Sequence, residues 1–191
     1  MLAVRSFRRL DVDARIIEKA GQSARVAKLV LPGVGSFGPA SDFLRNSGFA
    51  SVIMERVRKG DSVLGVCLGF HLFCETSEES GAQVGLSLFK AKVKKLLTSK
   101  GRKVPHVGWT RVSSFLGAGI ASISVGSRFY FSHSFEVKAA EPRKIAGCTA
   151  RYGQDDLLAA WHSENILGVQ FHPEKSGENG LRLLQKFAQS E

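Results

Sequence analysis

A cysteine between two glycines is the residue whose setting most directly implies covalent chemistry. Cys67 lies in the segment GVCLG at residues 65–69, directly after the apolar run Val63–Val66. An apolar strand that ends in Gly-x-Cys-x-Gly and passes into a helix is the cysteine form of the nucleophile elbow, a sharp turn that lifts a side chain out of a sheet. The N–H groups at the helix start favour a thiolate. The pattern predicts a reactive cysteine; the alternative is a small buried residue between packing glycines.

A cysteine nucleophile needs a base, and the base needs an acid that orients it. His172 and Glu174 follow the apolar strand predicted at residues 166–171, and Pro173 keeps the segment out of a helix. Side chains two apart on an extended chain point to the same side. Cys67 also ends a strand, and sites in open α/β sheets gather along the edge where strands end. We therefore predict a Cys67–His172–Glu174 triad.

A glycine-rich loop follows a third predicted strand. The segment PGVGSFG at residues 32–38 comes directly after the strand predicted at residues 28–31. Closely spaced glycines let backbone N–H groups turn toward a ligand, as an oxyanion hole for acyl transfer requires. The loop lacks the Lys-Ser/Thr of a P-loop, so we do not interpret it as a phosphate cradle. A plain turn between strand and helix is the alternative.

The segments PGVGSFG, GVCLG and GVQFHPEKS, in this order, resemble those of class I (triad) glutamine amidotransferases. Within that family they are most similar to the glutaminase subunits of imidazole glycerol phosphate synthases. The stretches VPHVGW at residues 104–109 and YFSHS at residues 130–134 support the resemblance, which runs from about Leu29 to the C-terminus. Each segment alone is a weaker signal than the combination.

The resemblance implies that Cys67 attacks the side-chain amide of glutamine, giving a glutamyl thioester and ammonia. His172 would move the proton and Glu174 would orient His172. The resemblance assigns backbone N–H groups of three residues to the oxyanion hole: Val34, Gly35 and Leu68. It assigns five residues to glutamine binding: Gly33, His71, Glu79, His133 and Ser134.

The resemblance also implies a partner. Ammonia would pass to a cyclase subunit of (β/α)8 fold, held in a heterodimer, which uses it to make imidazole glycerol phosphate in histidine biosynthesis. Trp109 and Lys175 match positions that face this partner. The resemblance implies no cofactor and no metal.

The chain's main departures from the family pattern lie in two places. His71 stands where the family usually has a Gln that contacts substrate. His71 could replace that contact, tune the thiolate, or simply pack. The family also begins with an apolar strand and a turn, whereas this chain begins MLAVRSF. We therefore expect the N-terminal strand to be missing or shortened, either because residues 1–4 substitute for it or because the sequence is truncated.

Composition limits the other possibilities. The 191 residues predict one amidotransferase domain, residues 1–191. No apolar run approaches the ~18 residues of a membrane span, and no secretory signal is visible, so we expect a cytoplasmic protein. Three cysteines at unrelated spacings predict no disulfide framework, and no metal-ligand spacing occurs. We expect Cys74 and Cys148 to be buried and inert.

The net charge of +10 is the one unusual value, and residues 90–95 (KAKVKK) carry much of it. A basic stripe can bind nucleic acid. Here the lysines alternate with apolar residues, which is typical of a strand with a solvated face, and no aromatic residues offer a stacking platform. We therefore expect neither a nucleic-acid nor a membrane partner, although a basic face could complement an acidic subunit.

The elements predict an α/β fold: a three-layer sandwich with a mixed, mostly parallel central sheet. Strands and helices alternate before residue 80, which favours parallel βαβ units, and short strands dominate residues 86–171. The predicted strands are 28–31, 63–66, 86–89, 92–97, 104–107, 120–124, 128–132, 145–151, 157–161 and 166–171. The predicted helices are 39–46, 49–59, 69–79 and 177–189.

The leading hypothesis is thus a glutaminase that supplies ammonia for histidine biosynthesis. A paralogue that feeds a different synthase would use the same chemistry. A catalytically weak scaffold subunit is favoured by His71 and the short N-terminus but opposed by the intact triad. An RNA-binding domain rests on net charge alone.

Overall fold

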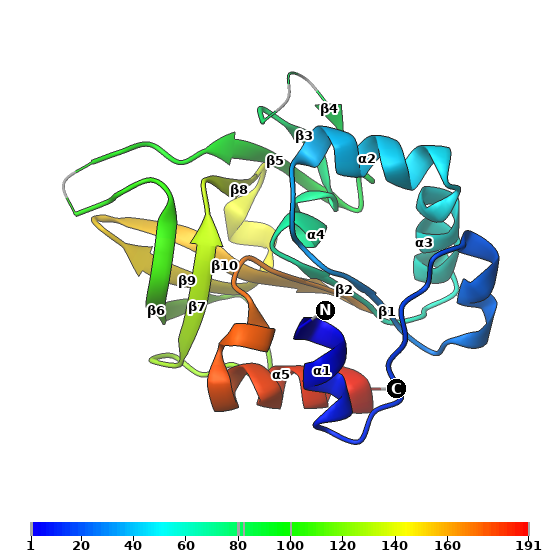
Figure 1. Ribbon diagram of the computed structural model, residues 1–191. Helices are drawn as coiled ribbons and strands as arrows, with labels where there is room; N and C mark the ends of the chain where they lie inside the picture. Colours follow the sequence, from blue (N-terminus) through cyan, green and yellow to red (C-terminus); the bar gives the residue numbers. More distant parts are fainter. Residues whose placement is uncertain (1, 80, 82, 100, 191) are drawn as a thin grey trace.

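Two sheets form the framework, and the computed structural model describes residues 2–79, 81, 83–99 and 101–190 (Figure 1). The α-helices are α1 (Leu2–Arg8), α2 (Phe37–Asn46), α3 (Phe49–Arg58), α4 (Leu68–His71) and α5 (Gly177–Gln189). The 3₁₀ helices are η1 (Ala20–Arg25), η2 (Pro142–Lys144) and η3 (Pro173–Lys175). The strands are β1 (Leu29–Leu31), β2 (Val63–Val66), β3 (Cys74–Ser77), β4 (Gln83–Val84), β5 (Phe89–Lys95), β6 (His106–Leu116), β7 (Arg128–His133), β8 (Phe135–Ala139), β9 (Ala146–Tyr152), β10 (Asp155–Ser163) and β11 (Ile166–Val169).

The larger sheet has seven strands in the order β1-β2-β11-β10-β9-β6-β7, and the smaller has four in the order β4-β3-β5-β8. The expected mixed α/β sheet is confirmed. The expectation that it is mostly parallel is wrong: only β1–β2 and β2–β11 pair in parallel, and the other neighbours in the larger sheet are antiparallel. Two-residue turns join β9 to β10 and β10 to β11, and such short connections permit only antiparallel pairing.

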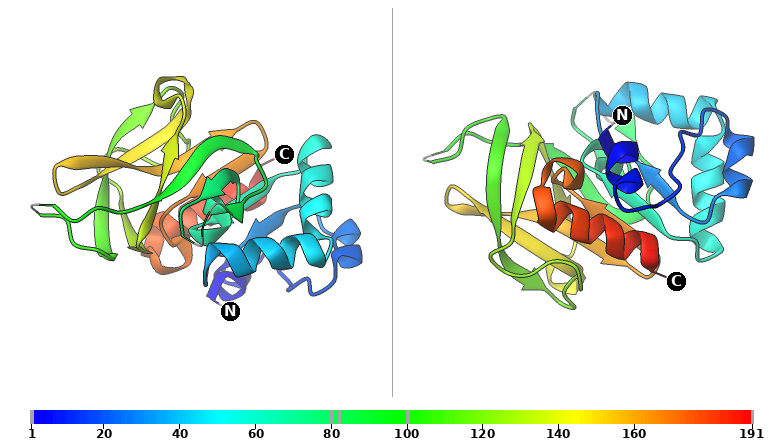
Figure 2. Two further views of the ribbon diagram at one scale, coloured as in Figure 1. Left: turned by 90° about the horizontal axis from the view of Figure 1, so that it is seen from above. Right: turned by 60° about the horizontal axis from the view of Figure 1, so that its bottom comes forward.

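Helices cover both faces of the parallel strands, which gives the three layers that the sequence predicts. Successive strand residues point to opposite faces. Leu64 packs in a core with Leu183 of α5, whereas its neighbour Val63 packs in a second core with Phe37 of α2 and Ile53 of α3. Figures 1 and 2 show α1 and α5 together on one side of β1 and β2, with α2, α3 and α4 on the other.

The N-terminal region contributes a helix where the family pattern begins with a strand. Among the described residues before Leu29, α1 and η1 are the regular elements, and Phe7 of α1 is buried against α5. β1 therefore lies at the edge of the seven-stranded sheet. An apolar groove of about 610 Å³ runs beside it, and its lining includes Val4, Ile16 and Phe49 but none of the predicted triad.

The region after Cys67 differs most from the predicted layout. The helix predicted at residues 69–79 is only four residues long, because residues 74–77 form β3, which pairs in parallel with β5. Residues 74–77 become a strand by pairing with β5, which lies further along the chain, so local periodicity alone could not decide. The strands β4 and β8 were not predicted, the segments 86–89 and 92–97 merge into β5, and residues 120–124 form no strand. No helix in the described part of the chain is long and apolar enough to cross a membrane.

Candidate active site

Cys67 occupies a strained turn between β2 and α4. Its φ of 50° and ψ of −104° are costly for a residue with a side chain, and such strain is typical of a nucleophile elbow. The turn is held by close packing, because a Cβ on Gly69 would lie 2.1 Å from Leu31 O and one on Gly65 would lie 2.8 Å from Gly69 O. The Cys67 N–H donates to Val169 O at 2.7 Å, which ties the elbow to β11.

His172 and Glu174 meet directly. The Nδ1 of His172 lies 2.9 Å from Oε1 of Glu174, and both side chains are largely buried. The extended geometry that we expected is wrong, since Pro173–Lys175 form the 3₁₀ helix η3. This turn brings the two side chains together. The hydroxyl of Ser176 donates to His172 O at 2.6 Å, and the His172 N–H donates to Tyr130 O at 2.8 Å, so the backbone of the histidine is fixed.

The electrostatics of His172 favour a charged imidazolium. Burial alone would lower its pKa, but hydrogen bonds to Cys67 and Glu174, together with their negative charges, outweigh burial and raise the pKa to about 9. Cys67 therefore lies close enough to His172 to help raise its pKa. A cysteine beside an imidazole that a carboxylate orients is the arrangement of a nucleophile and its base. The catalytic roles themselves remain predictions.

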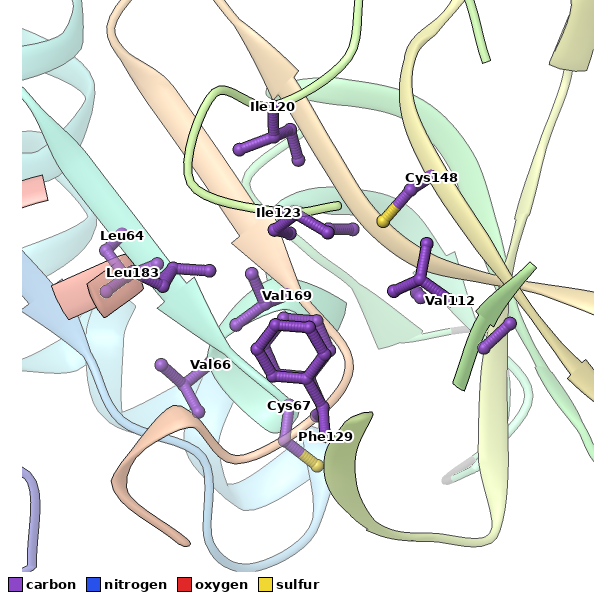
Figure 3. Packing of buried hydrophobic residues seen from close by; sticks show 14 of the residues in the cluster. Leu64, Val66, Cys67, Val112, Ile120, Ile123, Phe129, Cys148, Val169 and Leu183 are labelled. Carbon is purple, nitrogen blue, oxygen red and sulfur yellow. The ribbon is translucent and has the colours of Figure 1, made fainter. Parts of the chain in front are cut away.

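Cys67 differs from the other two cysteines in its surroundings. It lies just beyond Val66 at the end of β2 (Figure 3) and is slightly exposed, whereas Cys148 of the same core is fully buried. Burial raises the pKa of the Cys148 thiol to about 12, and burial also raises the pKa of Cys74. All three cysteines are free. The described residues contain no cluster of His, Cys, Asp and Glu that could hold a metal ion.

The glycine-rich loop lies against the elbow. A Cβ on Gly33 would meet Val66 O at 1.9 Å and Leu68 N at 2.4 Å, so only glycine permits this approach. Gly35 has a φ of 108°, and the Val34 side chain is 85% exposed. As the first residue of α4, Leu68 has no intrahelical acceptor for its N–H. The predicted oxyanion donors thus come from two adjacent backbone segments.

Three residues predicted to bind glutamine lie around these segments. The carboxylate of Glu79 accepts a hydrogen bond of 3.0 Å from Phe37 N–H, so it ties β3 to the end of the glycine-rich loop. His133 and Ser134 follow Ser132, whose carbonyl lies 3.9 Å from Cys67 Sγ. His133 is buried, and its ring nitrogens lie 2.7 Å from Phe135 O and 3.0 Å from a nitrogen of His106. Its imidazole is therefore engaged within the protein.

His71 is the fifth predicted pocket residue, and it is buried rather than open to a ligand. Its Nε2 lies 2.9 Å from Oε1 of Gln170, and the Gln170 Nε2 lies 3.8 Å from Cys67 Sγ. Burial lowers the pKa of His71 to about 4, so its ring is neutral at pH 7. Sequence reasoning missed Gln170. Gln170 lies two residues before His172, at the end of the strand predicted at residues 166–171. Side chains two apart on an extended chain point to the same side, and this spacing could have indicated Gln170.

Trp109 and Lys175, the predicted partner contacts, lie on one exposed patch with Tyr130. The Trp109 and Tyr130 rings meet edge to face with centroids 6.1 Å apart, and Lys175 Nζ lies 5.7 Å from the Tyr130 centroid. Arg128 lies over Trp109 at 5.8 Å. We call these four residues the aromatic patch. Exposed aromatic and arginine side chains are enriched at protein interfaces.

The basic segment is the solvated strand that its alternation predicts. In β5, Phe89, Ala91 and Val93 are buried while the intervening lysines are exposed. Lys94 pairs with Glu78 at 3.2 Å. The lysines of this segment therefore form the solvent-facing side of a half-buried strand.

Comparison with known proteins agrees with this architecture. The family model "Glutamine amidotransferase class-I" matches residues 3–190. The chain therefore belongs to the class I glutamine amidotransferase family. It is 40% identical over 186 residues to the imidazole glycerol phosphate synthase subunit HisH of Chlorobaculum tepidum, covering 97% of this chain and 92% of the relative. It is 43% identical over 164 residues to HisH of Pyrococcus furiosus, covering 84% of this chain and 80% of the relative.

Solved structures support the fold. A crystal structure of a glutamine amidotransferase superposes with a TM-score of 0.73 at 19% identity, covering 99% of this chain and 93% of the other. The glutaminase domain of Trypanosoma brucei CTPS with bound acivicin gives 0.67 at 14% identity, covering 100% and 86%. At these identities the likeness shows the α/β fold.

Proposed function

We propose that this chain is the glutaminase subunit of an imidazole glycerol phosphate synthase. It hydrolyses glutamine to glutamate and ammonia through Cys67, His172 and Glu174, and residues 1–191 act as one domain. The observation that carries the proposal is the strained elbow cysteine, which together with Glu174 raises the pKa of His172, in a chain 40% identical to a HisH subunit.

In the first half-reaction, the Cys67 thiolate attacks the amide carbon of glutamine, and the carbonyl oxygen becomes an oxyanion. Backbone N–H groups of Val34, Gly35 and Leu68 stabilise it, which in other enzymes is worth about 10²–10³ in rate per donor. Imidazolium His172 gives its proton to the leaving nitrogen. The C–N bond breaks, ammonia departs, and a glutamyl thioester remains on Cys67.

In the second half-reaction, His172 is neutral and serves as a base for water. Water attacks the thioester carbon, its proton passes to His172, and the C–S bond breaks to regenerate the Cys67 thiolate and glutamate. The Glu174 carboxylate, 2.9 Å from His172 Nδ1, holds the ring in one orientation and stabilises its positive charge in both halves.

The ammonia acceptor in this proposal is a cyclase subunit of (β/α)8 fold, bound as a heterodimer in the cytoplasm. The aromatic patch supports this assignment, because it exposes apolar surface that a partner could cover. Trp109 is 48% exposed, and Val107, two residues earlier on β6, is 57% exposed. The patch also lies next to the site in sequence and space, since Lys175 directly follows Glu174 and Tyr130 O accepts the His172 N–H. A partner seated there could receive ammonia before it mixes with solvent.

Replacing the nucleophile tests the proposal. Cys67→Ala should reduce glutamate production from glutamine by at least about 10⁴-fold, because no other group can form the thioester. The control is Cys148→Ala, which removes a buried cysteine outside the proposed triad and should retain activity. Folding of both variants is checked by circular dichroism. Hydrolysis by Cys67→Ala near the wild-type rate would sink the assignment of the nucleophile.

A further inference from the structure

Cys67 has a hydrogen-bond donor beside it that is not part of the predicted triad. The side-chain Nε2 of Gln170 lies 3.8 Å from Cys67 Sγ, within reach for a bond to sulfur. Gln170 is fully buried, and its N–H donates to Ala159 O at 2.8 Å, which fixes its backbone at the end of β11. A buried amide dipole interacts strongly with a nearby charge, because little water screens it.

His71 determines which end of this amide faces the sulfur. Its Nε2 lies 2.9 Å from the Gln170 Oε1, and both side chains are buried. A neutral imidazole carries one N–H, and placing it on Nε2 makes it a donor to that oxygen. The amide NH2 then points to Cys67. The reverse orientation would direct the carbonyl oxygen at the thiolate, where two negative ends repel.

We propose that Gln170 donates a second hydrogen bond to the Cys67 thiolate, beside His172, and that His71 is the positioning residue that holds the amide in this orientation. This inference rests on the proposed role of Cys67 as nucleophile. The donor stabilises the thiolate before attack and again when it leaves the thioester carbon. It also gives His71 a role at a position where the family usually has Gln: the imidazole acts through Gln170 on the sulfur.

The experiment measures how the rate at which iodoacetamide alkylates Cys67 depends on pH, followed by mass spectrometry on the full chain. Only the thiolate reacts, so the midpoint of the pH profile reports the balance between thiol and thiolate. Variants are Gln170→Leu, His71→Leu, the double variant, and His71→Gln, which restores a donor. Gln170→Met and His71→Phe replace any leucine variant that fails to fold.

Loss of one hydrogen bond to a charged sulfur should move the midpoint to higher pH by about one unit in Gln170→Leu and by less in His71→Leu. If His71 acts through Gln170, the double variant has the midpoint of Gln170→Leu alone, and His71→Gln keeps nearly the wild-type midpoint. A wild-type midpoint in either leucine variant, or a double variant shifted by the sum of the single effects, would overturn the proposal. Glutaminase loss in Cys67→Ala is a separate readout, so failure of the donor pair leaves the nucleophile assignment standing.

Discussion

Cys67 and Glu174 favour the charged form of His172, and these three residues are the chemical centre of the proposed site. Burial works against a charged His172, yet its contacts with Cys67 and Glu174 raise its pKa to about 9. A group with a raised pKa in the folded state contributes stability below its unfolded value of about 6.5, and this contribution is lost as pH rises toward 9. The same shift keeps a proton available for the leaving ammonia at neutral pH.

Removing the sulfur should therefore lower the pKa of His172. In Cys67→Ala, burial still disfavours the imidazolium, and Glu174 alone supports it. An NMR titration of the His172 ring in the two proteins measures the difference. The expected result is a titration midpoint at lower pH in Cys67→Ala. Equal midpoints in the two proteins would show that Cys67 does not interact with His172 as described.

The elements that form the site are joined by close backbone contacts at glycines. The glycine-rich loop approaches the elbow at Gly33, and the elbow approaches the end of β1 at Gly69. Neither contact leaves room for a side chain. Close packing therefore fixes the relative positions of the backbone segments that form the site, as an oxyanion hole requires.

A methyl group at Gly69 should break this arrangement. Gly69→Ala places a Cβ 2.1 Å from Leu31 O, a clash that backbone must relieve, so we expect a loss of about 2 kcal/mol or more in the free energy of unfolding. The matched control is Gly21→Ala, where no atom lies within 4 Å of the new Cβ and the change should stay within about 0.5 kcal/mol. Urea unfolding measures both. Equal stabilities would contradict the packing described for the elbow.

The element scale also shows what the sequence could predict. The elbow, the apolar strand before His172 and the helix at residues 177–189 follow from local patterns, and the structure has them. The pairing of β6 with β9 joins strands that are far apart in the sequence, which local patterns do not encode. The contact between Gln170 and Cys67 joins side chains that are 103 residues apart in the sequence. The local sequence of residues 74–77 does not distinguish a strand from a helix, and their pairing with β5 makes them a strand.

The molecule as a whole buries three neutral histidines. Burial lowers the pKa of His71 and His106 to about 4 and that of His133 to about 3. His106 contacts His133 and stacks on Tyr152, with ring centroids 3.8 Å apart, so it joins the β6–β7 strands to β9. In the unfolded chain these rings would take up protons near pH 6.5.

The fold should therefore lose stability on mild acidification. Between about pH 6.5 and pH 4 the unfolded chain binds more protons at these histidines than the folded one, so the free energy of unfolding falls as pH falls. We expect a loss of a few kcal/mol from pH 7 to pH 5, at most about 1.4 kcal/mol per pH unit for each histidine. His172 does not offset this loss, since its contribution is already complete below pH 6.5. Urea unfolding across this pH range measures it, and constant stability would contradict neutral burial of the three rings.

The most direct test of the proposed function is glutamate production from glutamine by the purified chain, alone and with the cyclase subunit of the same organism. The account predicts slow hydrolysis by the chain alone, a clear rise when the cyclase is added, and none with Cys67→Ala in either condition. No hydrolysis in either condition by a folded protein would contradict the proposed glutaminase. Equal rates with and without the cyclase would contradict the proposed partner.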